Sequence, residues 1–404
     1  MPFKESSPTD QRLAFLQLLE GGMSHSEACR YFGISRPTGY KILGRYQKEG
    51  VQGLLDQSRA PHHSPQTTSQ TVIDQILELK AKHPYWGPKK LKAVHQTRTT
   101  GMGCEPWPSL TTIGTILKTR GLVKSRTRRG SCPAINTPLS GLTQPHCPNH
   151  VWSVDYKGHF SLGDGNICYP LTMTDNETRF LLRCQALPDV TYERAWPYFV
   201  GAFREFGLPQ VIRSDNGAPF AANSITGVSR LSLNLLKLGI LPERIAPGKP
   251  QQNGRHERMH RTLKAETTIP PRYEMSAQQR RFDAWRQEYN EIRPHEGIAM
   301  ATPASLFTVS PRCYPSRPPE LEYPGGMKVM RVRPNGCIRW KGNELYLGEV
   351  LCGEPVGIDH YAAQYQAIYV GQLPIALIIE ETGILASRTK THDQLRLLRV
   401  PASD

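Results

Sequence analysis

The sequence predicts a multidomain protein: all-α helix-turn-helix modules come first, an α/β core follows, and a small all-β barrel ends the chain. Three observations support this prediction. Short amphipathic helices separated by glycine turns fill the first third of the chain. A hairpin meander followed by alternating helices and strands fills the middle. Beyond a proline-rich linker at residues 311–324, short strands recur between Gly and Asn turns.

The length of 404 residues fits two to four domains at ~100–200 residues each. Stretches rich in Pro, Ser and Thr separate the helical and core segments, as expected of linkers. The expected domains are residues 1–57, a helix-turn-helix module; 66–130, a second helix-turn-helix or winged module; 148–309, the core; and 325–404, the barrel.

Positive charge is concentrated at the front of the chain. Lys and Arg total 50 against 35 Asp and Glu, which gives a net charge of +15. Residues 1–150 hold 20 Lys and Arg but 9 Asp and Glu. Such an excess favours a polyanionic partner, with nucleic acid ahead of an anionic membrane. The alternative is a solvated basic surface without a partner.

The spacing of cysteines and the length of apolar runs indicate the cellular location of the protein. The nine cysteines form no C-x-x-C pair, which indicates a reducing, cytoplasmic location and excludes a disulfide scaffold. Cys132, His146, Cys147 and His150 lack the paired spacing of a zinc site. The longest strictly apolar run, Leu373–Ile379, is too short to span a bilayer, so we expect no membrane partner.

The first module has helix-turn-helix spacing. Residues 9–20 carry leucines at helical spacing, and Ser24 with Glu27 forms a capping box for a second helix. Gly33 ends that helix and a third follows, whose early polar residues are expected to enter a major groove of DNA. Gly39 departs from this pattern, because an aliphatic residue would be expected to pack better there. The candidate DNA-binding residues are Arg36, Thr38, Tyr40, Lys41 and Arg45.

The second module repeats the helical pattern and ends in a basic run. Three short helices are expected near residues 72–83, 86–94 and 109–120. The run that follows carries four positive charges in six residues, a density suited to tracking phosphates. Its candidate DNA contacts are Lys124, Arg126, Arg128 and Arg129.

Three carboxylates in the middle domain form a candidate catalytic set. Asp155 and Asp215 stand at the ends of short predicted strands, and Glu257 lies early in a predicted helix. If the three converge, they repel one another unless a cation neutralises them, and hard oxygen ligands select Mg²⁺ or Mn²⁺. Two such ions ~3.5–4 Å apart can clamp the attacking and leaving oxygens of an in-line phosphoryl transfer. The alternative is three unrelated acids.

Four strings carry a family resemblance: VWSVDYKG, VIRSDNGAPF, IAPGKPQQNGRHERMHRTLKAE and EYNEIRPHEGIAMATPASLF. They resemble the core of bacterial insertion-sequence transposases and, more widely, the retroviral-integrase-like DDE recombinases. The resemblance extends over nearly the whole chain, because the front half is similar to the paired helix-turn-helix modules of the same transposases. It implies an RNase H-like fold for the core.

The resemblance also assigns roles. The family's first Asp lies on the first strand, the second just after the fourth strand, and the Glu on a following helix. Asp155, Asp215 and Glu257 fill these positions, so the resemblance implies two bound Mg²⁺ ions, with Mn²⁺ as a substitute. The resemblance implies helix-borne DNA contacts at Asn253, Arg255, Arg258 and Arg261. The basic residue Lys264 on the same helix is added to this set. A closing motif of structural role is implied at Tyr289, Asn290, Arg293, Pro294 and His295.

One departure from the family pattern concerns spacing. Between Asp215 and Glu257 lie 41 residues, more than in many relatives. We expect Ser224–Leu238 to hold the extra length as a longer loop and helix. Glu243 and Glu266 remain alternative third ligands, although Glu257 is preferred because it lies inside the matching string.

Together these expectations describe a DNA transposase that binds the terminal inverted repeats of an insertion sequence. It would cleave the 3′ ends of its element and transfer them to target DNA, as a homodimer or larger assembly associated with the nucleoid. Two alternatives remain open. One is a non-catalytic DNA-binding protein that keeps the fold, and the other is a metal-dependent nuclease that cuts without joining.

Overall fold

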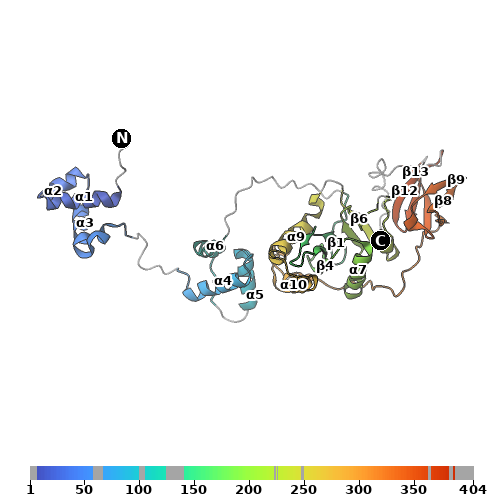
Figure 1. Cartoon of the computed structure of the whole chain (residues 1–404), viewed down its shortest axis with the longest axis horizontal. Coiled ribbons are helices and arrows are strands. Elements are labelled where there is room, and N and C mark those ends of the chain that lie inside the picture. The colour runs from blue at the N-terminus through green and yellow to red at the C-terminus, as the bar shows by residue number, and fades with distance from the viewer. Residues whose placement is uncertain are drawn as a thin grey trace. The chain divides into compact units, whose positions relative to one another are not determined.

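The computed structural model describes residues 7–57, 67–99, 105–123, 141–222, 224, 226–246, 250–362, 365–381 and 385–386 (Figure 1). The chain divides into two compact units, Met1–Ser69 and Gln70–Asp404. The predicted DNA contacts Lys124, Arg126, Arg128 and Arg129 lie outside the described residues. No helix within those ranges is long and apolar enough to cross a membrane.

The first unit is a small helical bundle. Its elements are α1 (Pro8–Glu20), α2 (His25–Tyr31), α3 (Arg36–Glu49) and the 3₁₀ turn η1 (Gly50–Leu54). A serine caps each α-helix: Ser7, Ser24 and Ser35 each accept a bond from the backbone N–H three residues on. Such caps satisfy one of the amide groups that a helix start leaves without a partner. The core packs Phe15 and Leu16 against α2 and η1.

Gly39 corrects the expectation of an aliphatic residue in α3. The position is buried, and a Cβ added there would lie 2.6 Å from Cys29 Sγ and 2.9 Å from two ring atoms of His25. Both of those side chains belong to α2. Glycine is therefore what lets α3 approach α2 this closely, because any larger side chain would push the two helices apart.

The second unit begins with three more helices: α4 (Gln70–Lys82), α5 (Pro88–Thr99) and α6 (Leu110–Thr119). They share a core in which Ile76, Leu91 and Ile113 are fully buried and Trp86 is almost so. Residues 67–99 and 105–123 contain no strand, so a winged module has no support within these two segments.

A mixed α/β layer follows. Its strands are β1 (Val151–Tyr156), β2 (Phe160–Ser161), β3 (Ile167–Asp175), β4 (Leu181–Leu187), β5 (Val211–Ser214) and β6 (Leu241–Arg244). Strand β1 pairs antiparallel with β3 and parallel with β5, while β4 covers the other edge of β3 and β6 extends the sheet beyond β5. The resemblance places the second Asp just after the fourth strand. Asp215 instead follows β5, because the two-residue strand β2 adds one to the count.

Helices cover both faces of this sheet. They are α7 (Tyr192–Phe206), α8 (Arg230–Lys237), α9 (Gly254–Thr267) and α10 (Met275–Gln287). The short element η2 (Pro250–Asn253) precedes α9, and η3 (Glu288–Ile292), η4 (Glu296–Ile298) and α11 (Pro303–Leu306) follow α10. Leu171 and Met173 of β3 pack with α7, whereas Cys168 of the same strand packs with α9 and α10. Side chains of a strand point alternately to opposite faces of the sheet, so Cys168 lies on the face opposite to Leu171 and Met173.

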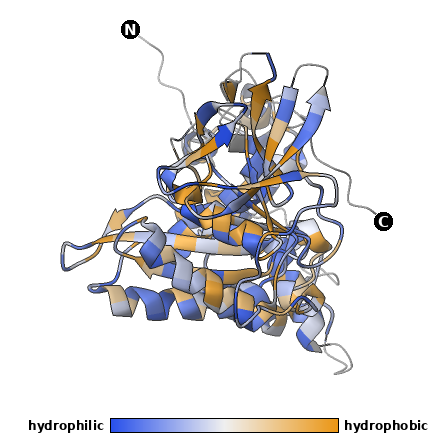
Figure 2. Ribbon diagram, turned by 90° about the vertical axis from the view of Figure 1, so that its right-hand side faces the viewer, coloured by the Kyte–Doolittle hydropathy of each residue, from blue (hydrophilic) through white to orange (hydrophobic). Residues whose placement is uncertain are grey.

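The C-terminal segment is an open antiparallel sheet. Its strands are β7 (Lys328–Arg331), β8 (Cys337–Trp340), β9 (Asn343–Tyr346), β10 (Pro355–Ala362), β11 (Tyr365–Val370), β12 (Leu373–Ile379) and β13 (Leu385–Ala386), with the 3₁₀ turn η5 (Glu349–Leu351) after β9. Five strands run in the order β13-β12-β11-β10-β7, and β8 pairs with β9 alone. The expected barrel is therefore not closed among the described strands. In Figure 2 several of these strands are orange, the colour of hydrophobic residues.

The packing of α8 explains why the sheet stays open and why the chain is long between Asp215 and Glu257. Leu231 and Leu235 of α8 join the core of the α/β layer, while Leu233 and Leu236 join the core of the C-terminal sheet. Lys237 forms an ion pair with Glu354. The apolar face of the C-terminal sheet thus packs against α8, within the segment expected to hold the extra length, rather than curling onto itself.

Asn290 fastens the end of α10 to the sheet. Its side-chain oxygen accepts a bond of 2.8 Å from Leu181 N, and its Nδ2 donates one of 3.0 Å to Leu181 O, the first residue of β4. The residue is 5% exposed. This contact supports the structural role predicted for the closing motif.

We predict that Asn290→Ala lowers the free energy of unfolding by about 2–4 kcal/mol, because two buried backbone groups lose their partner. Asn166→Ala is the matched control: that amide also bonds a neighbour, Asp164, but is exposed. Urea titration followed by tryptophan fluorescence measures both. Equal effects of the two substitutions would show that the Asn290 contact adds nothing to stability.

Candidate active site

Asp155 of β1 lies level with Asp215, the residue that directly follows the neighbouring strand β5. Ser153 of β1 is in register with Arg213 of the parallel strand β5, so the residues two positions further along, the two aspartates, are also level. Asp215 begins the turn after β5, and its charge contributes to the raised pKa of Asp155. Adjacent strands are ~4.8 Å apart, so the two carboxylates are close neighbours at the carboxyl ends of β1 and β5.

Glu257 lies in the first turn of α9 and its side chain is exposed. Its charge reaches Asp155. The pKa of Asp155 is raised to about 7, first by burial, then by repulsion from Asp215, with a smaller contribution from Glu257. Asp155 is therefore within electrostatic range of both of the other predicted acids.

The turn after β5 shapes the Asp215 side chain. Gly217 N donates to Asp215 Oδ1 over 3.0 Å, and Asn216 Nδ2 donates to Ile245 O over 2.8 Å. A Cβ on Gly217 would lie 3.2 Å from Asp215 Oδ2. The Asp-Asn-Gly tripeptide is thus a turn that holds its own first carboxylate in place.

The two alternative third ligands are occupied elsewhere. Glu243 of β6 is buried and accepts bonds from Arg213 Nε at 2.8 Å and from Thr143 N at 2.9 Å. Glu266, near the end of α9, pairs with Arg293 Nη1 at 2.8 Å and accepts from Trp285 Nε1 at 2.6 Å. Of the three glutamates considered, Glu257 alone has an exposed side chain and a charge that reaches Asp155.

Two histidines beside Asp155 were not predicted as site residues. His256 and His260 of α9 are buried, and both Nε2 atoms lie 2.7 Å from Thr172 Oγ1 on β3. His260 Nδ1 lies 3.8 Å from Asp155 Oδ2. Together Asp155, His256 and His260 form the group of metal-ligating side chains found within the described residues. The signal was present in the sequence as two histidines four residues apart, which share one face of a helix.

The predicted DNA contacts on α9 fall into two groups. Arg258, Arg261 and Lys264 are exposed. Arg255 is exposed as well, but its Nη1 donates to Asn176 O over 2.9 Å, and Asn253, which directly precedes α9, is 6% exposed. Arg258, Arg261 and Lys264 follow Glu257 along the helix. Asn253 and Arg255 contribute to the local fold.

The candidates in α3 also differ among themselves. Arg36, Thr38, Tyr40 and Lys41 are exposed, and the Tyr40 ring stacks on His25 with centroids 3.7 Å apart. Arg45 is half-buried, and its Nη2 donates to Leu55 O. That arginine therefore ties α3 to the chain that follows η1.

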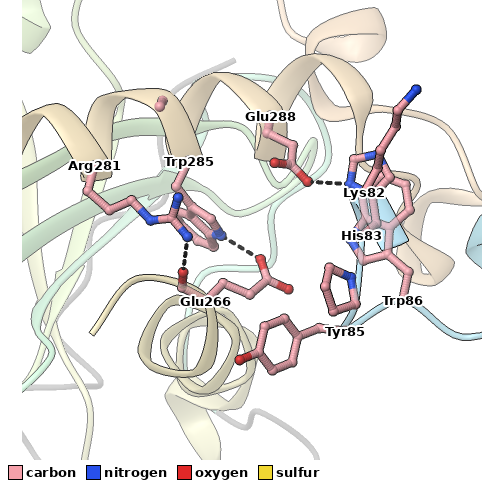
Figure 3. Close-up of a pocket in the computed structure, with 10 residues that line it drawn as sticks. Lys82, His83, Tyr85, Trp86, Glu266, Arg281, Trp285 and Glu288 are labelled. Atoms are coloured by element: carbon pink, nitrogen blue, oxygen red, sulfur yellow. Dashed lines mark hydrogen bonds and ion pairs between the residues drawn. The ribbon is translucent and has the colours of Figure 1, made fainter. Parts of the chain in front are cut away.

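A cavity of about 190 Å³ lies between the α4–α5 connection and α10 (Figure 3). His83 Nδ1 is 2.8 Å from Glu288 Oε1, and the His83 ring stacks on Trp86. The hydrogen bond from His83 lowers the pKa of Glu288. Glu266 lines the same cavity, nine residues after Glu257, so at ~100° per residue it faces the opposite side of α9. This cavity is therefore separate from the three carboxylates.

Comparison with known families agrees with this geometry. Two integrase core domain models match residues 145–250 and 238–303, and two homeodomain-like domain models match residues 7–55 and 38–117. The chain therefore carries an integrase core behind homeodomain-like helix-turn-helix domains, and it is similar to insertion-element proteins. This domain order is transposase-like and is consistent with transposition and DNA integration.

The relatives include insertion-element and retroviral proteins. An uncharacterized 31.7 kDa protein of insertion element IS407 from Burkholderia multivorans is 25% identical over 290 residues, which cover 70% of this integrase-core chain and 90% of that protein. A 39.2 kDa protein of insertion element IS476 from Xanthomonas euvesicatoria is 25% identical over 313 residues, covering 75% and 78%. The Gag-Pol polyprotein of baboon endogenous virus is 28% identical over 138 residues, covering 33% of this chain and 7% of the polyprotein.

Solved structures similar to this one are retroviral integrases. The HTLV-2 integrase catalytic core domain in complex with magnesium covers 41% of this chain and all of its own, with a TM-score of 0.33 and 15% identity. A simian T-cell lymphotropic virus intasome in complex with a PP2A regulatory subunit covers 72% of this chain and 91% of that chain, with a TM-score of 0.36 and 17% identity.

The three carboxylates fit a divalent cation. They offer oxygen donors, and burial followed by repulsion from Asp215 raises the pKa of Asp155, so its anion is disfavoured. A bound cation would supply the compensating positive charge. The residues that would hold it are Asp155, Asp215 and Glu257.

We predict opposite consequences for two glutamine substitutions in the core. Glu243→Gln removes the charge paired with buried Arg213 and should lower the free energy of unfolding by about 3 kcal/mol. Glu257→Gln removes an exposed, mutually repelling charge and should change it by less than about 0.5 kcal/mol. Urea titration measures the free energy of unfolding of both variants. A destabilisation by Glu257→Gln as large as that by Glu243→Gln would contradict the prediction.

Proposed function

We propose that this chain is a metal-dependent DNA transposase that cleaves the 3′ ends of its own element and joins them to target DNA. One observation carries the proposal. In the integrase core, Asp155 of β1 stands level with Asp215, which directly follows the parallel strand β5, and Glu257 is close enough to help raise the pKa of Asp155. Carboxylates so placed are suited to holding the ions of an in-line displacement at phosphorus.

Asp155 and Asp215 would hold two divalent ions, Mg²⁺ with Mn²⁺ as a substitute, and Glu257 would complete the ligands of one. When bound, these ions supply activation of the attacking oxygen and stabilisation of the leaving oxygen. In cleavage, a water oxygen bonds to phosphorus and the 3′ oxygen leaves, taking up a proton to become a 3′-OH. In joining, that 3′-OH oxygen bonds to a target phosphorus and the target's own 3′ oxygen leaves. Each step exchanges one P–O bond for another, so no further co-reactant is needed.

Exposed cations beside the carboxylates would bind the DNA backbone. Arg258, Arg261 and Lys264 are exposed on α9, the helix that carries Glu257. Phosphate contacts of this kind fix the position of a duplex without reading its sequence. We assign them to holding the strand whose phosphate reaches the carboxylates.

Sequence recognition would come from the front half of the chain. We propose that residues 1–57 and 66–130 are separate DNA-binding domains that read the terminal inverted repeats, ahead of a catalytic domain at 148–309 and a C-terminal domain at 325–404. The exposed start of α3 would enter a major groove. Two element ends must meet for joining, so we propose a homodimer or larger assembly on DNA, associated with the nucleoid.

The activity test uses purified full-length protein, Mg²⁺ and a labelled duplex carrying the terminal repeat found beside the gene. Asp155→Asn and Glu257→Gln should lower cleavage and joining by more than about 10²-fold while DNA binding persists, because transition-state charge stabilisation is lost. Cleavage without joining, even from a pre-cut 3′ end, would favour a nuclease. Binding without metal-dependent chemistry would leave a DNA-binding protein.

The recognition test compares cations along α3. Arg36→Ala combined with Lys41→Ala should weaken binding to the terminal repeat by about tenfold or more, since major-groove contacts are each worth about 1–3 kcal/mol. Lys48→Ala, an exposed cation in the last turn of the same helix, is the matched control and should change affinity by less than about twofold. Fluorescence anisotropy measures both, and an equal loss in the control would contradict a recognition role for the start of α3.

A further inference from the structure

His260 occupies the space between α9 and the carboxylate of Asp155. The residue is 5% exposed. Its Nδ1 faces Asp155 Oδ2 at 3.8 Å, which is beyond hydrogen-bond length. Within the described part of the chain, this carboxylate is the polar contact found for that nitrogen. A ring nitrogen that faces a carboxylate without bonding it requires an explanation.

The hydroxyl of Thr172 determines which ring nitrogen carries the proton. A threonine hydroxyl has one proton to donate and two lone pairs. Thr172 Oγ1 donates to the backbone oxygen of Asp155 over 3.1 Å, and that oxygen can only accept. The Nε2 atoms of His256 and His260, each 2.7 Å away, must therefore donate to the two lone pairs.

His256 provides an independent check of this assignment. With its proton on Nε2, its Nδ1 is an acceptor, and Thr174 Oγ1 lies 2.9 Å from that atom and can donate to it. Every polar atom of the two threonine side chains and of His256 then has a partner of the correct kind. By the same assignment His260 Nδ1 carries a lone pair rather than a proton.

A lone pair and a carboxylate that face each other are both acceptors, so their arrangement favours a cation between them. Nitrogen and oxygen ligands each lie about 2.0–2.2 Å from a small divalent ion. Two ligands of one ion can therefore be separated by up to about 4.2 Å, and the 3.8 Å between His260 Nδ1 and Asp155 Oδ2 falls within that reach.

We infer that His260 Nδ1 is, with Asp155, a ligand of one of the divalent ions in the carboxylate site. The inference rests on the proposed function, because it assigns a nitrogen donor to the site that the three acids would form. An imidazole ligand suits a transition-metal ion better than Mg²⁺, so Mn²⁺ should bind this position more tightly than Mg²⁺ does.

The neighbouring histidine excludes a different metal site. His256, Glu257 and His260 spell the H-E-x-x-H pattern, in which two histidines on one helix face bind zinc. Both nitrogens of His256 are bonded to threonine hydroxyls, so that ring is not free to ligate. The site therefore takes one nitrogen donor, and His256 serves as an internal control.

The experiment is pulsed EPR of the full-length chain loaded with Mn²⁺. Electron spin echo envelope modulation detects a nitrogen bonded directly to the ion. We expect ¹⁴N modulation in the wild type, and ¹⁵N-histidine labelling should shift its frequencies. His260→Asn should abolish the modulation and weaken Mn²⁺ binding by about tenfold, the loss of one donor. His256→Asn, checked for folding by circular dichroism, should keep the modulation.

The outcomes separate this inference from the proposed function. Saturable Mn²⁺ binding that is lost in Asp155→Asn but shows no nitrogen modulation would overturn the role of His260 and leave the carboxylate site intact. Modulation that persists in His260→Asn would overturn it as well. If Mn²⁺ does not bind at all, both the ligand role of His260 and the metal-dependent function are wrong.

Discussion

The repulsion between Asp155 and Asp215 is the constraint on which the rest of the core depends. The register between β1 and β5 places both carboxylates at the same level, where burial and mutual repulsion raise the pKa of Asp155 to about 7. A fold that forces two anions together must hold the strands against that repulsion. The parallel pairing of β1 with β5 does so, and the buried ion pair between Arg213 and Glu243 joins β5 in turn to β6 just before the aspartate.

Helix α9 brings the third acid to this pair while its other face stays fixed. His256 and His260 attach the helix to β3 through Thr172, which itself bonds the backbone of Asp155. Glu266 attaches the far end of the helix to Arg293 and Trp285. The exposed face is thereby left to Glu257 and the cations that follow it. The exposed face of α9 is therefore available for a chemical role, while its other faces anchor the helix.

Much of this organisation could be predicted from the sequence, because caps, turns and motif strings are local signals. The helices of the first unit followed from Ser24, Glu27 and Gly33, and the candidate acids from the strings around them. Packing across long separations could not be read in this way. The close approach at Gly39, the two-sided burial of α8 and the open C-terminal sheet depend on neighbours that spacing does not reveal. The His260–Asp155 contact was missed for the same reason.

The central claim is that Asp155, Asp215 and Glu257 hold divalent cations. A crystal structure of the protein soaked in Mn²⁺, with anomalous scattering measured at the manganese edge, tests it most directly. The expected result is anomalous density between Asp155 and Asp215, with Glu257 beside one of the ions. Density located elsewhere in the chain, or none at these carboxylates at saturating Mn²⁺, would contradict the claim.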